Sequence, residues 1–162
     1  MDVPLPDLAL VPSVVHAPET SRAGRSPGSP LPRRVLVVED EWFIAEDIAD
    51  DLRTAGWEVL GPVPSVADAV SLIEAAASDG GISVAVLDVN LQGERVTPVA
   101  DALAAIGVPF LFATGYETDC DRGRHLDAPL VVKPCRGAAL LQAVSRVAAQ
   151  RESMDLPAAR SA

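Results

Sequence analysis

The sequence is poor in the features by which several classes of protein are recognised. Aromatic residues make up only 4% of the 162 residues, so a surface that stacks nucleic-acid bases on exposed rings is poorly supplied. The net charge of -10 would repel phosphate backbones and anionic membranes. Cys120 and Cys135 are too few for a disulfide framework and lack the paired spacing of a zinc site, so we expect them to serve packing or surface roles. We therefore expect no direct DNA binding and no membrane association.

Long apolar runs are also missing. No stretch approaches the roughly 18 apolar residues that a membrane-spanning helix needs, and residues 1–16 lack the basic start of a secretory signal. Apolar residues nevertheless make up 49% of the chain, which is enough to bury a sizeable core. We expect a cytoplasmic chain with one folded domain.

Composition divides the chain into three parts. Residues 1–32 contain seven of the fourteen prolines and no sustained apolar period, which predicts a disordered tail. The folded domain is expected over residues 33–150. Residues 151–162 are short and polar, and we expect a flexible C-terminal tail there.

Short apolar runs alternate with segments of helical periodicity, the pattern of strand–helix units around a parallel sheet. The expected strands cover residues 35–38, 57–63, 82–87, 108–113 and 130–132. The expected helices cover residues 44–55, 66–77, 98–106 and 138–149, and any helix within 116–129 is expected to be short. Ser65 and Asp68 form a weak capping box, and Thr97 and Pro98 have the order of an N-cap and a first helical residue.

Reactive side chains follow four of the expected strands. In an open parallel sheet, ligands bind beyond the carboxyl ends of the strands, so these side chains should gather at one edge. They are Glu39, Asp40 and Glu41 after the first strand, Asp88 and Asn90 after the third, Thr114 and Gly115 after the fourth, and Lys133 and Pro134 after the fifth.

The acidic turn after the first strand decides what this edge can bind. A phosphate cradle needs Gly-rich backbone amides free of negative charge, so a nucleotide or flavin would be repelled here. Clustered carboxylates suit Mg²⁺, which prefers oxygen ligands and keeps several waters. Without a cation, two carboxylates about 5 Å apart repel by roughly 3 kcal/mol at an effective dielectric constant near 20. We therefore expect Asp40→Asn or Asp88→Asn to raise the melting temperature in chelator.

Lys133 is the only lysine beside twelve arginines. A lysine offers a compact ammonium on a flexible stem, which suits a pocket that holds one small anion. The following Pro134 predicts a cis peptide bond that aims the ammonium inward, because cis peptides are almost confined to bonds before proline.

From about Arg34 to Ala149 the chain resembles the receiver domain of two-component response regulators. The resemblance is carried by four segments in the order typical of that family: Val-Leu-Val-Val-Glu-Asp-Glu at 35–41, Leu-Asp-Val-Asn at 87–90, Ala-Thr-Gly at 113–115 and Val-Lys-Pro at 132–134. It implies an α/β, flavodoxin-like (βα)5 fold with a parallel five-stranded sheet in the order 2-1-3-4-5.

The resemblance also implies roles for the residues at these positions. Asp88 would accept a phosphoryl group from a phosphohistidine, and Thr114 and Lys133 would bind the phosphoryl oxygens. The Mg²⁺ ligands would be Asp40, Asp88, Glu39 through water, and the backbone carbonyl of Asn90. Gly115 would leave the approach to Asp88 open, and Asn90 and Tyr116 would tune how quickly the phosphoryl group is lost to water.

The chain departs from the usual pattern at Leu130, where the family commonly has Tyr or Phe. Instead, Phe-Ala-Thr-Gly-Tyr at 112–116 resembles a subgroup common among stand-alone regulators, in which Tyr116 takes over the coupling role. That subgroup typically pairs with histidine kinases of the HWE and related classes. The partners implied are such a kinase or a phosphotransfer protein, and a downstream protein reached by contact.

The resemblance leaves two alternatives. The chain could be an adaptor that is never phosphorylated, or a metal-dependent phosphohydrolase or nuclease that uses Glu39, Asp40 and Asp88; the Lys-Pro turn argues against the second. We interpret His125 as incidental and Trp42 as partly packed or at the pocket mouth. The acidic residues of the first helix are expected to form a solvated face: Glu46, Asp47, Asp50 and Asp51.

Overall fold

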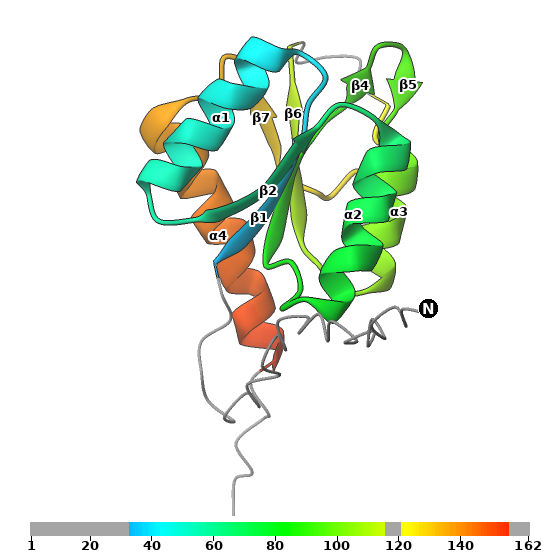
Figure 1. The fold of residues 1–162 in the computed structure, drawn as a ribbon, viewed down its shortest axis with the longest axis vertical. Helices are drawn as coiled ribbons and strands as arrows, with labels where there is room; N and C mark the ends of the chain where they lie inside the picture. Colours follow the sequence, from blue (N-terminus) through cyan, green and yellow to red (C-terminus); the bar gives the residue numbers. More distant parts are fainter. Residues whose placement is uncertain (1–32, 116–120, 156–162) are drawn as a thin grey trace, which may run out of the picture. The chain divides into compact units, whose positions relative to one another are not determined.

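The computed structural model describes residues 33–115 and 121–155, with side chains described as far as Arg151. Its centre is a parallel five-stranded sheet with the order β2-β1-β3-β6-β7 (Figure 1). The strands are β1 (Arg34–Val38), β2 (Glu58–Val63), β3 (Val84–Asp88), β6 (Phe110–Thr114) and β7 (Leu130–Val132). Counted along the chain, this is the order 2-1-3-4-5, so the predicted flavodoxin-like α/β fold is confirmed.

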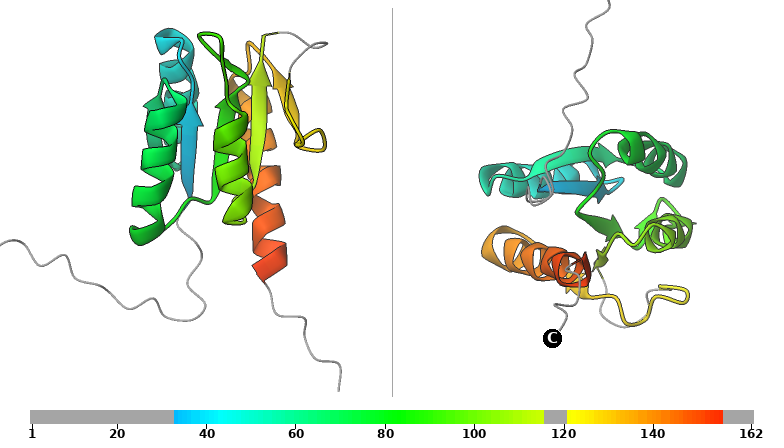
Figure 2. Two further views of the ribbon diagram at one scale, coloured as in Figure 1. Left: turned by 90° about the vertical axis from the view of Figure 1, so that its right-hand side faces the viewer. Right: turned by 90° about the horizontal axis from the view of Figure 1, so that it is seen from below.

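Helices cover both faces of the sheet. They are α1 (Trp42–Thr54), α2 (Val66–Ser78), α3 (Thr97–Ala105) and α4 (Gly137–Asp155). Helices α1 and α4 pack on one face, and α2 and α3 pack on the other (Figures 1 and 2). No helix among the described residues combines the length and the apolar character needed to span a membrane.

Strand β1 shows why these runs of apolar residues become central strands. Successive side chains of a strand point to opposite faces of the sheet. Leu36 and Val38 accordingly pack in the core beneath α2 and α3, and Val35 and Val37 pack in the core beneath α1 and α4. All four are fully buried. A strand buried on both faces needs a continuous apolar run, and this is the pattern that predicted it.

Helix ends follow the predicted signals with one correction. The Ser65 hydroxyl accepts a hydrogen bond from the backbone N–H of Asp68 over 3.1 Å, which confirms the cap of α2. Helix α1 ends before Gly56, whose φ of +84° favours glycine. Helix α3 begins at Thr97 with Val96 as its N-cap, one residue earlier than predicted. The prediction of Thr97 as the cap was wrong because Thr97 and Pro98 can both occupy the first turn of a helix, which leaves the cap to the residue before them.

A short hairpin after β3 was not predicted. It pairs β4 (Asn90–Leu91) with β5 (Glu94–Arg95) in antiparallel fashion. The two turn residues, Gln92 and Gly93, have φ values of +53° and +90°, which a two-residue turn between antiparallel strands requires. Strands of two residues carry too little alternation to be recognised in a sequence. The hairpin lies at the carboxyl edge of the sheet (Figure 1).

The segment before β7 and the end of the last helix bear on the expected chain organisation. The chain between β6 and β7 forms turns without a helix over residues 121–129, where the sequence allowed at most a short helix. Helix α4 runs to Asp155, so residues 151–155 are helical and the flexible tail expected from residue 151 does not begin there. The predicted N-terminal tail, residues 1–32, and residues 156–162 lie outside the described residues.

Candidate functional site

The carboxyl edge of the sheet brings together residues from four parallel strands. Glu39 directly follows β1, Asp88 ends β3, Thr114 ends β6 and Lys133 directly follows β7. Glu39, Asp88 and Thr114 are all less than a tenth exposed. Because the strands run in parallel and in register, residues far apart in the chain meet here, as the sequence predicts.

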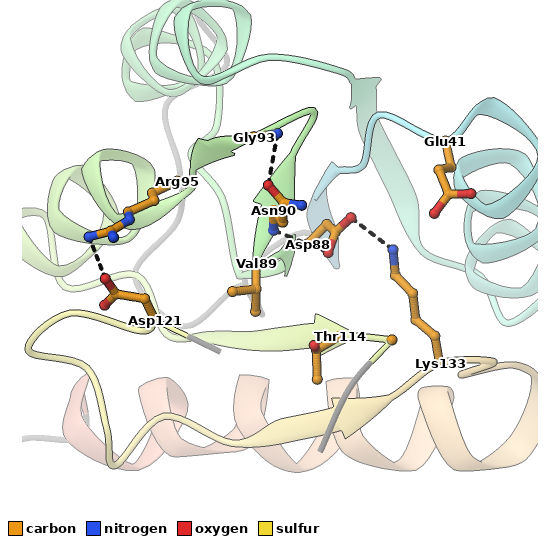
Figure 3. A pocket seen from close by; sticks show the side chains of 10 residues that line it. Glu41, Asp88, Val89, Asn90, Gly93, Arg95, Thr114, Asp121 and Lys133 are labelled. Atoms are coloured by element: carbon orange, nitrogen blue, oxygen red, sulfur yellow. Dashed lines mark hydrogen bonds and ion pairs between the residues drawn. The ribbon is translucent and has the colours of Figure 1, made fainter. Parts of the chain in front are cut away.

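Lys133 is the central contact of the site. Its Nζ lies 2.8 Å from Asp88 Oδ2 (Figure 3). The same atom lies 2.6 Å from Glu39 Oε2. The backbone holds this side chain in place, because the Lys133 N–H donates to the carbonyl of Thr114 over 2.7 Å. The peptide bond before Pro134 is cis, as predicted. The ammonium therefore bridges the acids that follow β1 and end β3.

Three acids form a candidate metal site. Carboxylate oxygens of Glu39, Asp40 and Asp88 lie within 4.8 Å of one another. Glu39 Oε2 is buried and, apart from its close contact with Lys133, has no partner in hydrogen-bonding geometry among the described residues. A hard divalent cation such as Mg²⁺ takes oxygen ligands of this kind and keeps several waters. The donor set therefore fits Mg²⁺.

The electrostatics of the site follow from burial and from opposite charges. Burial raises the pKa of Glu39 to about 7, and the charge of Asp88 acts in the same direction, while Lys133 opposes the rise. Burial would lower the pKa of Lys133, but its close contacts with Asp88 and Glu39, together with the negative charges of these acids, outweigh burial and raise that pKa. Lys133 therefore remains an ammonium beside acids whose charges it balances.

Asp88 faces an open pocket of about 380 Å³. The lining residues come from the turn before α1, the end of β3, the β4–β5 hairpin, the end of β6 and the segments after β6 and β7: Glu41, Asp88, Val89, Asn90, Gly93, Arg95, Thr114, Gly115, Asp121 and Lys133. A Cβ added at Gly115 would meet no atom of the described residues within 4 Å. The pocket thus leaves room for a small group beside the Asp88 carboxylate.

Asn90 lies next to Asp88 in this pocket. Its backbone N–H donates to Asp88 Oδ1 over 3.4 Å, and its side-chain oxygen accepts a hydrogen bond from the N–H of Gly93 over 2.8 Å. The second bond lies within the hairpin and directs the amide side chain toward the turn (Figure 3). The hairpin therefore positions Asn90.

Two charged residues of the pocket were missed in the sequence. Arg95, on β5, and Asp121, beyond β6, form an ion pair of 2.5 Å on the side of the pocket opposite Lys133 (Figure 3). Neither residue directly follows one of the predicted strands. The turn pair Gln92-Gly93 was the available signal for the hairpin that carries Arg95 into the pocket.

The other residues considered in the sequence lie outside the pocket or outside the described residues. His125 Nε2 lies 2.7 Å from Asp101 Oδ1, and its ring packs edge-on against Phe110. Trp42 is 66% exposed and does not line the pocket. Cys135 is buried in the core, as predicted. Tyr116 and Cys120 lie outside the described residues.

Solved structures of regulatory proteins resemble this chain. The solution structure of SdrG from Sphingomonas melonis Fr1 is 40% identical, aligns with 74% of this chain and 98% of that protein, and has a TM-score of 0.61. The chain is a response-regulator receiver domain. The receiver protein from Sinorhizobium medicae, 24% identical over 73% of this chain and 95% of that protein, shares the fold with a TM-score of 0.63.

Curated relatives agree with this assignment. The transcriptional regulatory protein PdtaR of Mycobacterium tuberculosis is 30% identical over 118 residues, which cover 70% of this chain. The chain spans about half the length of these curated relatives, since the match covers 56% of PdtaR. No family model matches the chain. The receiver domain thus belongs to the two-component regulators, whose receivers act as phosphoryl acceptors in signalling.

Proposed function

We propose that Asp88 of this receiver domain accepts a phosphoryl group from the phosphohistidine of a histidine kinase or a phosphotransfer protein, in a reaction that depends on Mg²⁺. The observation that carries the proposal is the contact of 2.8 Å between Lys133 Nζ and the Asp88 carboxylate, at the side of an open pocket that Thr114 also lines. Lys133 and Thr114 supply a positive charge and a hydroxyl where phosphoryl oxygens would lie.

In the proposed reaction, a carboxylate oxygen of Asp88 attacks the phosphorus in line with the bond to the donor histidine. The phosphorus–nitrogen bond breaks, the histidine nitrogen leaves with its electron pair, and an acyl phosphate forms on Asp88. Lys133 neutralises charge on the transferred group, and the Thr114 hydroxyl donates to one of its oxygens. Gly115 leaves the approach open.

The metal would be held by Asp40, Asp88 and the backbone carbonyl of Asn90, with Glu39 acting through water. Bound there, Mg²⁺ would supply charge neutralisation for the phosphoryl oxygens. Lys133 already balances Glu39 and Asp88, so the acids are held in position before a cation arrives. Lys133, directly after β7, therefore orients the nucleophile.

The chain would transmit its signal by protein contact, or serve as an intermediate or sink for phosphoryl groups. The resemblance of Phe-Ala-Thr-Gly-Tyr at 112–116 to a receiver subgroup favours a histidine kinase of the HWE or a related class as donor. The reaction would take place in the cytoplasm. Asn90 and Tyr116 would modulate the lifetime of the acyl phosphate, and Pro134 would aim the Lys133 ammonium toward it.

Incubation with acetyl phosphate and Mg²⁺ tests the proposal. We expect the intact mass of the chain to rise by one phosphoryl group in an acid-stable, hydroxylamine-labile form, as acyl phosphates require. Asp88→Asn should abolish the adduct, and Asp121→Asn, outside the proposed metal ligands, should retain it. No adduct with any donor would favour the adaptor alternative, and turnover of a phosphoester substrate would favour the hydrolase.

A further inference from the structure

Arg95 and Asp121 connect two segments at the mouth of the pocket that holds Asp88. Arg95 lies on β5 of the hairpin, and Asp121 begins the described part of the chain between β6 and β7. Their ion pair of 2.5 Å is exposed, with side chains 70% and 47% accessible. An exposed pair of this kind contributes little to stability, so a stronger anion nearby would displace Asp121 readily.

The hairpin brings Arg95 toward Asp88. Arg95 pairs directly with Asn90 in the antiparallel register, and directly paired residues present their side chains on the same face. Asn90 is two residues beyond Asp88 and donates its N–H to the Asp88 carboxylate. Arg95 and Asp88 line the same pocket of about 380 Å³.

The charges in the pocket make Arg95 available to a new anion. Its described lining contains two cations, Arg95 and Lys133. Lys133 already contacts two carboxylates, whereas Arg95 contacts Asp121 alone among the described acids. A phosphoryl group brings about two negative charges and three oxygens, and guanidinium binds such a group through two parallel hydrogen bonds.

We propose that Arg95 is a phosphoryl-binding residue that exchanges Asp121 for the phosphoryl group on Asp88. The inference rests on the proposed function, since it needs Asp88 to be phosphorylated. The exchange uncouples the hairpin from the segment 121–129. That segment stays attached to α3 through the ion pair of Arg124 with Asp101 and the hydrogen bond between His125 and Asp101, so the change is confined to its Asp121 end.

This exchange would pass the signal of phosphorylation from Asp88 to the surface of the domain. Such a route matters here because this chain has Leu130 at the position where related receivers commonly carry an aromatic residue. Asp121 Oδ1 accepts a hydrogen bond from the N–H of Gly123 over 2.9 Å. The amide of Gly123 therefore reports on whether the Asp121 carboxylate is bound by Arg95 or free.

The test adds BeF₃⁻ and Mg²⁺ to the full chain and measures both affinity and the Gly123 amide chemical shift. In the unsubstituted chain we expect the shift to move toward its position in Asp121→Asn. Arg95→Gln should bind BeF₃⁻ about tenfold more weakly, as expected for the loss of hydrogen bonds to a charged group. Asp121→Asn should bind it more tightly, because Arg95 no longer has a competing partner.

Arg124→Gln is the matched control. Arg124 is 71% exposed, forms an ion pair of 2.8 Å with Asp101 and anchors the same segment from outside the pocket. It should retain the affinity and the Gly123 response of the unsubstituted chain. If Arg95→Gln bound BeF₃⁻ as tightly as the unsubstituted chain, or more tightly, Arg95 would be only a structural anchor and the inference would be overturned. An equal loss of BeF₃⁻ affinity in Arg95→Gln and Arg124→Gln would overturn it as well. Acetyl phosphate labelling of Asp88 in the same samples separates these results from failure of the proposed function.

Discussion

At the level of single residues, Lys133 reduces the electrostatic repulsion between the acids of the site. Its ammonium contacts both Glu39 and Asp88, so two of the three clustered carboxylates have a positive partner without a metal ion. The exception is Asp40, since the Lys133 ammonium is in ion-pair contact with the other two acids. The expected repulsion therefore falls unequally on the three acids.

Glu39 should make the stability of the metal-free protein depend on pH. Its pKa is about 7 in the folded chain and 4.5 in the ordinary reference state. Between these values the folded chain holds a proton that the unfolded chain has released, so stability is greatest at the acidic end and falls as pH rises to about 7. Thermal unfolding in chelator should show a fall in melting temperature on the order of several degrees over this range.

Glu39→Gln should flatten this fall, because glutamine does not titrate. The control is Glu74→Gln, which changes an exposed glutamate of α2 and should retain the dependence. An equal slope in Glu39→Gln and the unsubstituted chain would mean that burial of Glu39 does not govern this range.

At the level of elements, the acidic face of α1 holds the start of α4. Asp51 Oδ2 accepts a hydrogen bond from the N–H of Gly137 over 2.5 Å, and Asp47 forms an ion pair of 2.8 Å with Arg136. The prediction of a solvated face holds for Asp47, whose side chain is 44% exposed, but it missed that Asp51 bonds to the next helix. A helix N-terminus has unpaired N–H groups, and here the acceptor comes from another helix.

Asp51→Ala should therefore destabilise the domain by about 1 kcal/mol, as the loss of a capping carboxylate does. Asp50→Ala provides the comparison, because Asp50 lies on the same helix and pairs only with Arg53 at the surface, so its loss should change stability by about 0.5 kcal/mol or less. Urea unfolding of both variants measures the difference. Equal effects would show that the contact with Gly137 does not stabilise α4.

At the level of the whole molecule, the proposed metal site joins the ends of β1 and β3 and so should influence global unfolding. A ligand that binds only the folded state stabilises it by about 2.7 kcal/mol at a concentration one hundred times its Kd. Because the described site contains three acids within 4.8 Å, Mg²⁺ should raise the melting temperature of the unsubstituted chain.

Asp40→Asn should lose this gain from Mg²⁺ and melt at a higher temperature than the unsubstituted chain in chelator, since it removes the unpaired charge. Asp88→Asn should also lose the gain, but without the rise in chelator, because Lys133 loses one of its two partners. This revises the expectation from the sequence that both variants would be stabilised. A lower melting temperature of Asp40→Asn in chelator would contradict the repulsion within the cluster.

The sequence by itself determined which segments form the strands and that Glu39, Asp88, Thr114 and Lys133 lie at their carboxyl ends, whereas the order of the strands was implied by the family resemblance. Strands buried on both faces require continuous apolar runs, and parallel strands deliver the residues that follow them to one edge. Both patterns are local in the chain, so they can be read without knowing how distant segments pack.

Only the tertiary structure decided which partners these residues choose. The pairing of Lys133 with Glu39 and Asp88, of Arg95 with Asp121, and of Asp51 with Gly137 joins residues separated by many positions. A side chain selects among several opposite charges by distances of a few ångströms. Those distances are set by how the helices pack and by a hairpin whose two strands have two residues each. Neither produces a periodic pattern in the sequence from which the distances could be predicted.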